Sequence, residues 1–212
     1  MGPLRILVVG TRSFAAEIAG FASEAGFEVA GLLEPFEPSR VGETIHGLPV
    51  TWLEEARPGG LAVVVGTGEV TRRPVTDRIL AAGLELTTIV HPRAHVAATS
   101  TVGPGTIVAP GVVVGAVATI GAGVVLGRGA LVGHHTHIGE FATLGPGANV
   151  AGNVRVGADV HVGMGAVVRD HVELGDGATV GMGAVVVRDV PAGVTVHGVP
   201  ARPVATRRRD SE

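Results

Sequence analysis

Cysteine is absent from this chain of 212 residues. Without thiols the protein forms no disulfides, binds no zinc through thiolates and has no cysteine nucleophile. Lysine is also absent, so arginine supplies every basic side chain other than histidine. The formal net charge is −3, and such a weakly acidic chain is not expected to bind nucleic acid or an anionic membrane surface.

Aromatic residues make up only 3% of the chain, although hydrophobic residues make up 46%. A core built from branched aliphatic side chains is expected to be narrow, as it is in a β-solenoid. No apolar run has the roughly 20 residues that a membrane-spanning helix needs. The start, MGPLRILVVG, is too short for a signal peptide and continues directly into a strand pattern. The expected location is the cytoplasm.

A period of six residues runs from Val90 to Pro191. Every sixth residue from Val90 to Val186 is aliphatic, and no insertion breaks the register. The following residue is mostly glycine, and the fifth position of each hexad is small or β-branched. Helices repeat every 3.6 residues and half-buried strands every two, so this period indicates a hexapeptide-repeat parallel β-helix. We expect the aliphatic residues inside, and the glycine near a corner where a Cβ would cause strain.

The residues before this repeat alternate between strand and helix patterns. We predict strands at 4–10, 27–33, 48–51, 61–66 and 86–90, and helices at 14–25 and 70–82. Such alternation is typical of a small parallel α/β domain. The predicted fold class is therefore an N-terminal α/β domain with a small Rossmann-like parallel sheet, followed by an all-β left-handed parallel β-helix. The predicted boundaries are 1–89 for the α/β domain, 90–197 for the β-helix, and 198–212 for a C-terminal extension that packs over it and ends in a solvated tail.

In a parallel α/β sheet, ligands bind at the carboxyl ends of the strands. Here those ends lead into the loops 10–14, 34–37 and 66–71. The first loop, GTRSFA, has one glycine and is not the GxGxxG fingerprint of a dinucleotide site. Arg12 precedes a helix N-terminus, where it could meet a phosphate or carboxylate. A solvated loop arginine remains an alternative interpretation.

Two identical hexads, VGMGAV, occupy 162–167 and 180–185. Since three hexads make one coil, these segments stack, with Met164 under Met182. We interpret the two methionines and the neighbouring glycines, Gly163 and Gly181 among them, as an apolar ledge for an extended thioester arm. Plain repeat sequence remains the alternative, because glycine is expected at corners in any case.

Three histidines cluster at 134, 135 and 137. His134 occupies the outward third position of its hexad, and imidazole is the side chain best suited to accept a proton at neutral pH. His135 and His171 have the spacing of two zinc ligands in gamma-class carbonic anhydrases, and Asp176 occupies the position of a third. A zinc hydro-lyase therefore stays open as an alternative, as does a solenoid that only binds or assembles. Solvent-facing histidines without a role are the remaining alternative, which we favour for an isolated histidine and much less for this cluster.

Several segments together resemble a known family. The order of an α/β domain, the linker HPRA, unbroken hexads and the segments GHHTHIGEFATLGPGANVAGNVRVG, GMGAVV and VVVRDVPAGVTVHGVPAR is similar to the sialic-acid-O-acetyltransferase-like hexapeptide-repeat sugar acyltransferases. These include the bacterial nucleotide-sugar N-acetyltransferases. The resemblance extends to about Pro203. It implies a homotrimer with acetyl-CoA as co-substrate between adjacent β-helices, a sugar-type acceptor on the α/β domain, direct transfer without a covalent enzyme intermediate, and no metal.

The resemblance also implies roles for residues. His134 matches the general base, and His135 replaces the acidic residue that usually follows it. We expect Asn153, one coil beyond His135, to substitute as a hydrogen-bonding partner, and the Gly152 amide to stabilise the oxyanion. The implied acetyl-CoA contacts are Thr143, Met164 and Met182. The implied acceptor contacts are Gly10, Thr11, Arg12, Ser13, Glu34 and Gly66, in loops that depart from the family pattern.

Overall fold

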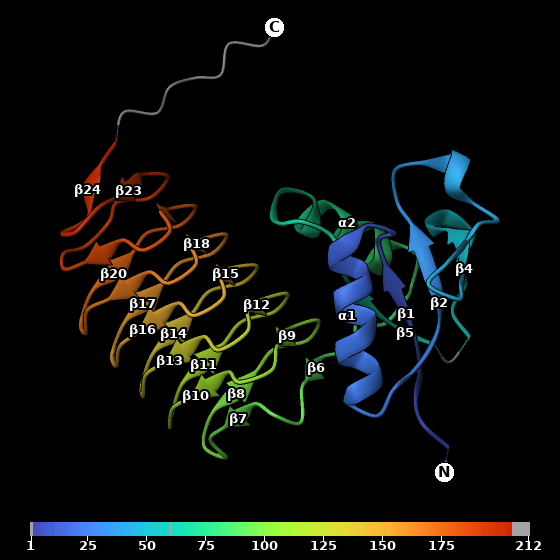
Figure 1. Ribbon diagram of the computed structural model, residues 1–212, viewed down its shortest axis with the longest axis horizontal. Coiled ribbons are helices and arrows are strands. Elements are labelled where there is room, and N and C mark those ends of the chain that lie inside the picture. Colours follow the sequence, from blue (N-terminus) through green and yellow to red (C-terminus); the bar gives the residue numbers. More distant parts are fainter. Residues whose placement is uncertain (1, 60, 205–212) are drawn as a thin grey trace, which may run out of the picture.

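The computed structural model describes residues 2–59 and 61–204. Two units lie side by side in Figure 1: an α/β unit, drawn in blue to cyan, and a β-helix, drawn in green to red. The helices α1 (Ser13–Glu24) and α2 (Glu69–Ala81) belong to the first unit. The described residues contain no helix with the length and apolar character that crossing a bilayer requires. The predicted fold class, an α/β domain followed by a parallel β-helix, is confirmed.

The α/β unit contains one five-stranded sheet in the order β3-β4-β2-β1-β5. Its strands are β1 (Arg5–Val9), β2 (Glu28–Glu34), β3 (Thr44–Ile45), β4 (Leu48–Trp52) and β5 (Ala62–Val65). The pairs β1–β2, β1–β5 and β2–β4 are parallel, as the alternating pattern predicts. The short β3 adds an antiparallel edge to β4 that the pattern did not predict.

Two glycines set how closely α1 approaches the sheet. A Cβ on Gly66 would lie 2.9 Å from Cα of Ala15, and a Cβ on Gly10 would lie 3.1 Å from the carbonyl oxygen of Gly66. Gly10 also has a φ of +111°, a conformation that disfavours other residues. The ends of β1 and β5 therefore meet the first turn of α1 only because both positions lack a side chain.

The β-helix consists of three parallel sheets, with eight, six and five strands. Strand partners are 18 residues apart up to the last coil, so that Val113 pairs with Leu131 and Val125 with Thr143. In the last coil the spacing is 16, as for Thr179 and Thr195. The eight-stranded sheet faces the α/β unit and contains β6 (Ile89–Val90), β9 (Ile107–Val108), β12 (Val125–Leu126), β15 (Thr143–Leu144), β18 (His161–Val162), β21 (Thr179–Val180), β23 (Thr195–His197) and β24 (Arg202–Pro203). The six-stranded sheet contains β7 (His95–Val96), β10 (Val113–Val114), β13 (Leu131–Val132), β16 (Asn149–Val150), β19 (Val167–Val168) and β22 (Val185–Val186). The five-stranded sheet contains β8 (Thr101–Val102), β11 (Thr119–Ile120), β14 (His137–Ile138), β17 (Arg155–Val156) and β20 (Glu173–Leu174).

The aliphatic column forms the core of the β-helix, as the period of six predicts. Every sixth residue from Val108 to Val186 is buried. Of the earlier members, Val96 and Val102 are half-buried and Val90 is 40% exposed, because they belong to the first coil, which has no coil before it. A long, narrow core of this kind gains stability coil by coil.

The glycines that follow core aliphatic residues are required for a different reason than the one predicted. A Cβ on Gly139 would lie 2.5 Å from the carbonyl carbon of Gly157 in the next coil. The left-handed bend occurs two residues later, at residues such as His135 (φ +57°) and Gly177 (φ +65°). Close approach between stacked coils therefore requires the glycine, whereas the bend itself does not.

Two of the three corners make this bend with different types of residue. At the corner between the six- and five-stranded sheets, side-chain-bearing residues adopt positive φ: Val117, His135, Asn153 and His171. At the corner that follows the eight-stranded sheet, glycine does so: Gly111, Gly129, Gly147, Gly165 and Gly183. The first corner therefore carries functional side chains, and the second presents a bare backbone.

The strand predicted at 86–90 differs in the structure, and the C-terminal extension pairs with the β-helix. The segment Leu86–Val90 does not close the α/β sheet as one strand. Leu86 makes a single parallel bridge with Val63, whereas Ile89 and Val90 pair with β9 in the β-helix. At the other end, β24 folds back to pair antiparallel with β23. The predicted solvated tail, RRRDSE, lies outside the described residues.

Apolar and charged contacts hold the two units together. Ile107 and Val125 of the β-helix share a buried cluster with Ile18 of α1. Nη2 of Arg72, on α2, donates hydrogen bonds to the Phe141 carbonyl oxygen (2.6 Å) and to Oγ1 of Thr143 (2.7 Å). Burial lowers the pKa of Arg72 to about 10, so the guanidinium stays protonated at neutral pH. A buried, charged donor thus fixes α2 against the β-helix.

The exposed neighbour Arg73 provides a comparison for Arg72. Nη2 of Arg73 lies 2.7 Å from Oδ2 of Asp159, but its side chain is 38% exposed. We expect Arg72→Met to lower the free energy of unfolding by about 1.5–3 kcal/mol, because charged hydrogen bonds to buried acceptors are lost. Arg73→Met should cost about 0–1 kcal/mol, as for other exposed ion pairs. Urea denaturation measures both, and equal losses would contradict the role given to burial.

The glycine argument predicts unequal effects at two positions of one corner. Gly139→Ala should lower the free energy of unfolding by about 3 kcal/mol or more, since its Cβ would meet backbone held in strand pairs. At Gly177 there is open space and only the positive φ is unfavourable, so Gly177→Ala should cost about 1–2 kcal/mol. Thermal and urea denaturation of the two variants test this difference. A larger loss at Gly177 would show that the bend, and not the coil spacing, requires glycine.

Candidate active site

A cavity of about 360 Å³ lies between the two units. Its walls are α1, the start of α2 and the eight-stranded sheet with the corner that follows it. Most of the lining is apolar and includes Phe14, Ile18, Phe21, Leu144, Met164 and Met182. The polar lining includes Thr67, Glu69, Arg72, Thr143 and His161. We call this space the interdomain cavity.

The structure brings three of the expected acetyl-CoA residues together at one end of the interdomain cavity. Thr143 lies on β15, and Met164 and Met182 lie on successive turns of the glycine corner. The two methionines are 51% and 69% exposed. A Cβ on Gly163 would lie 2.6 Å from the backbone nitrogen of Met182, so coil stacking alone requires that glycine. Gly181, in the next coil, is the equivalent position. The two methionines of the expected ledge therefore lie on adjacent coils and line the same cavity.

A second cavity, of about 490 Å³, lies at the carboxyl ends of β1, β2 and β5. We call it the loop cavity. All six expected acceptor residues line it: Gly10, Thr11, Arg12, Ser13, Glu34 and Gly66. Phe14, Thr67 and Gly68 line both cavities. The loop cavity and the interdomain cavity therefore adjoin, and a single extended ligand could occupy both.

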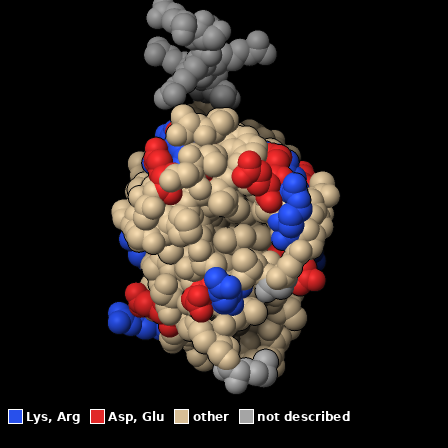
Figure 2. Space-filling model, turned by 90° about the vertical axis from the view of Figure 1, so that its right-hand side faces the viewer, with Lys and Arg blue, Asp and Glu red and all other residues tan. Residues whose placement is uncertain are grey.

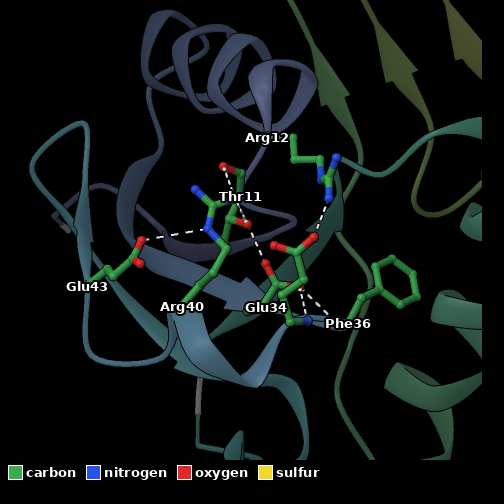
Figure 3. Close-up of polar contacts among 7 residues, drawn as sticks. Thr11, Arg12, Glu34, Phe36, Arg40 and Glu43 are labelled. Carbon is green, nitrogen blue, oxygen red and sulfur yellow. Dashed lines mark hydrogen bonds and ion pairs between the residues drawn. The ribbon is translucent and has the colours of Figure 1, made fainter.

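Glu34 shapes the wall of the loop cavity (Figure 3). Its Oε1 accepts hydrogen bonds from the backbone N–H groups of Phe36 (2.7 Å) and Glu37 (3.0 Å), and its Oε2 accepts one from the Thr11 hydroxyl. Arg40 donates to Oγ1 of the same threonine at 2.9 Å. With 3% exposure and three internal hydrogen bonds, the Glu34 carboxylate stabilises its own loop and has little capacity left for a ligand.

The N-terminus of α1 opens on the loop cavity. Its N-cap residue, Arg12, makes no side-chain cap, and the first turn contains no acidic residue. The first N–H groups of such a helix lack intrahelical acceptors and attract anions. Arg12 is 79% exposed and forms an ion pair with Glu37. In Figure 2, which faces the α/β unit, most basic side chains lie next to an acidic one. An anionic ligand would therefore be attracted locally, by this helix end and by Arg12, and not by a broad positive surface.

His134 lies on a different corner of the β-helix. Its Nδ1 is 3.1 Å from Nδ1 of His135, with the two rings nearly perpendicular at 85°. The ring of His134 packs over Gly152, where a Cβ would lie 2.8 Å from Cε1. The backbone N–H of Asn153 donates to the His134 carbonyl oxygen at 2.9 Å. Within the described residues, the side-chain partner of His134 is His135 and not Asn153.

Within one chain, His134 lies away from the ledge formed by Met164 and Met182. The His134 turn joins β13 to β14, whereas the ledge is formed by the turns after β18 and β21. His134 lines neither the interdomain cavity nor the loop cavity. His135 and His171, the pair with zinc-ligand spacing, lie on the His134 corner two coils apart. Over residues 2–59 and 61–204, no group of three or more potential ligands is placed to hold a metal ion.

Sequence reasoning did not single out two residues of the interdomain cavity, Glu69 and His161. Nδ1 of His161 lies 2.8 Å from Oε1 of Glu69, although not along the direction of a good ring N–H hydrogen bond. His161 lowers the pKa of Glu69, and nearby Arg72 acts in the same direction, whereas burial opposes them. The sequence did contain one signal for His161: it follows Thr143 by 18 residues, so the two residues are neighbours in stacked coils.

Comparisons with known proteins agree with this architecture. Residues 153–188 match the family model described as bacterial transferase hexapeptide (six repeats). No curated protein sequence matches the chain. The acetyltransferase domain of PglB from Neisseria gonorrhoeae FA1090, solved in complex with acetyl coenzyme A, is 31% identical with a TM-score of 0.88, and the match covers 96% of this chain and 100% of that one.

Two further solved structures are similar over nearly their whole length. PerB from Caulobacter crescentus, in complex with CoA and GDP-perosamine, is 30% identical with a TM-score of 0.88, covering 97% of this chain and 98% of that one. WeeI from Acinetobacter baumannii AYE is 26% identical with a TM-score of 0.84, covering 94% and 100%. From the repeat, the fold and these relatives, the chain belongs to the hexapeptide-repeat sugar acyltransferase family.

Proposed function

We propose that the protein transfers an acetyl group from acetyl-CoA to an amino or hydroxyl group of a nucleotide-linked sugar. The observation that carries this proposal is the pair of adjoining cavities, one at the strand ends and one that reaches the Met164–Met182 ledge. In similar structures, the PglB domain binds acetyl-CoA and PerB binds CoA and GDP-perosamine. A donor and an acceptor of this kind would meet in the interdomain cavity.

On the donor side, the ledge suits an extended thioester arm. Met164 and Met182 offer exposed apolar surface, and the glycine corner offers backbone groups that no side chain covers. The amides of a pantetheine arm can pair with such backbone. Thr143, held by Arg72 at the base of the cavity, would lie next to the acyl end.

On the acceptor side, the loop cavity suits the nucleotide. The uncapped N-terminus of α1 and the side chain of Arg12 would bind the diphosphate. The sugar would then pass Thr67 and Gly68, which line both cavities, and enter the largely apolar interdomain cavity. Glu34 would contribute by holding its loop in the conformation that lines this cavity.

For catalysis, we propose that His134 removes a proton from the attacking nitrogen or oxygen. The nucleophile attacks the thioester carbonyl carbon, the C–S bond breaks, and the proton passes to the thiolate of CoA. The Gly152 amide would stabilise the tetrahedral oxyanion, and His135 would orient the ring of His134 through the 3.1 Å contact. The chain has no cysteine to form an acyl-enzyme thioester, so transfer would be direct.

This arrangement needs a second copy of the chain. His134 and the ledge lie on different corners of one β-helix, so the imidazole would come from a neighbouring subunit. Three copies around an axis would place a His134 corner against each ledge and bury the exposed aliphatic residues of the side faces, such as Val113 and Leu131. We therefore propose a homotrimer with an active site at each junction.

Substitution of His134 tests its proposed role. With acetyl-CoA and a panel of UDP-, GDP- and dTDP-linked 4-amino sugars that includes GDP-perosamine, thiol release should fall by about 10²-fold or more in His134→Ala, as for a lost general base. His137→Ala, in the same cluster, should stay within about threefold of the parent. Activity of His134→Ala within that range would remove His134 from the mechanism. A larger loss in His135→Ala would make His135 the base.

Co-expression of two inactive variants tests the shared site. His134→Ala keeps the ledge, and Met164→Arg keeps His134 but places a charge on the ledge. Random mixing should restore about a quarter of the parent activity, because each junction takes its two halves from different chains. Mass photometry or native mass spectrometry confirms that mixed trimers form. Mixed trimers without recovered activity would show that both halves come from one chain.

A further inference from the structure

The interdomain cavity contains a carboxylate–imidazole pair that the proposed function does not use. Glu69 is the first residue of α2, and His161 lies on β18. Their nearest atoms, Oε1 and Nδ1, are 2.8 Å apart. The side chains are 46% and 31% exposed, so both are accessible from the cavity. Nδ1 of His161 is the ring nitrogen nearest Glu69, which leaves Nε2 as the ring nitrogen available to a ligand.

The charges around this pair favour an ionised Glu69. His161 itself is the largest cause that lowers the pKa of Glu69, with a smaller contribution from Arg72. Asp159, on the turn before β18, is engaged with Arg73. Across the cavity, Glu17 forms its own ion pair with Arg128 at 2.7 Å. The cavity is thus lined by two carboxylates, and the one on Glu69 is paired with an imidazole.

The chemistry of an amine acceptor calls for such a pair. Near neutral pH a sugar amine is largely an ammonium ion, whose nitrogen has no lone pair with which to attack. Transfer to it gives an amide, a thiol and one free proton, so two protons must leave the nitrogen. The His134 route returns one of them to the CoA sulfur. The first proton, lost before attack, needs a separate acceptor.

The environment of His134 does not suit it to both tasks. Its Nδ1 faces Nδ1 of another imidazole, His135, at 3.1 Å. One proton can lie on that line, and within residues 2–59 and 61–204 no carboxylate contacts this pair to stabilise an imidazolium. The Glu69–His161 pair has that carboxylate, and it lines the same cavity as the ledge.

We propose that Glu69 and His161 remove the first proton from the bound ammonium group, an inference that rests on the proposed acetyl transfer to an amine. The N–H bond breaks, its electron pair stays on nitrogen, and the proton moves to Nε2 of His161. The Glu69 carboxylate stabilises the resulting imidazolium, which later releases the proton to solvent. The neutral amine then attacks the thioester, and His134 handles the second proton.

The pH dependence of His161→Gln separates this role from a structural one. With acetyl-CoA and GDP-perosamine, or another 4-amino sugar nucleotide of the panel that the parent acetylates, kcat/KM should be about 10²-fold below the parent at pH 6.5. At pH 9 the acceptor has already lost its proton, so the deficit should shrink to about threefold. Glu69→Gln should follow the same trend. His134→Ala should not recover at high pH.

Glu17→Gln is the matched control, since it removes the other carboxylate of the cavity, and any deficit should be independent of pH. A deficit of His161→Gln that stays constant with pH, or no deficit at all, would overturn the inference while leaving the proposed function intact. If the parent acetylates no amine of the panel, the inference fails, and the proposed function then depends on a hydroxyl acceptor.

A second measurement needs no acceptor. In His161→Gln, the pKa of Glu69 should rise toward its usual value, because the largest cause of its depression is gone. Carboxyl ¹³C NMR titration, with Glu69→Gln to assign the resonance, follows this change. An unchanged pKa of Glu69 would show that the two side chains do not form the pair.

Discussion

The distance between stacked coils is the constraint on which the rest of the molecule depends. Neighbouring strands lie about 4.8 Å apart, and at this distance a Cβ would clash with the next coil at most of the positions that follow a core aliphatic residue, as Gly139 illustrates. Stacking at this spacing makes neighbours of residues 18 apart. It places Met164 beside Met182, and Thr143 beside His161. The candidate site is therefore a product of the repeat, and the functional side chains were added to positions that the core does not need.

Docking of the α/β unit turns one sheet of this solenoid into a cavity wall. Ile107 and Val125 bury apolar surface against α1. Arg72 donates hydrogen bonds to the Phe141 carbonyl oxygen and to the Thr143 hydroxyl. These contacts fix α2 so that its first turn, with Glu69, faces His161. The buried guanidinium thus has a positional role in addition to its contribution to stability.

Much of this was predictable from spacing, and the exceptions have physical causes. The period of six predicted the buried column, and counting 18 residues placed Met164 and Met182 together. The pair Glu69–His161 could not be found in this way, because its members are far apart in sequence and meet only through docking of the two units. The strand at Ile89–Val90 was assigned to the wrong unit, since an apolar dipeptide fits either sheet. Glu34 lines the loop cavity, but the sequence did not reveal that its carboxylate accepts hydrogen bonds from its own loop.

The coil of three hexads has a consequence for how such a chain can change in length. An insertion of one whole coil preserves which face every later residue occupies. An insertion of a single hexad also preserves the buried aliphatic column, but it moves all that follows to the next corner. A hexad inserted before His134 would therefore move this residue from the corner between the six- and five-stranded sheets to another corner, where its neighbours differ. Folding alone therefore tolerates steps of six, whereas a site that depends on the corner of His134 tolerates only steps of eighteen.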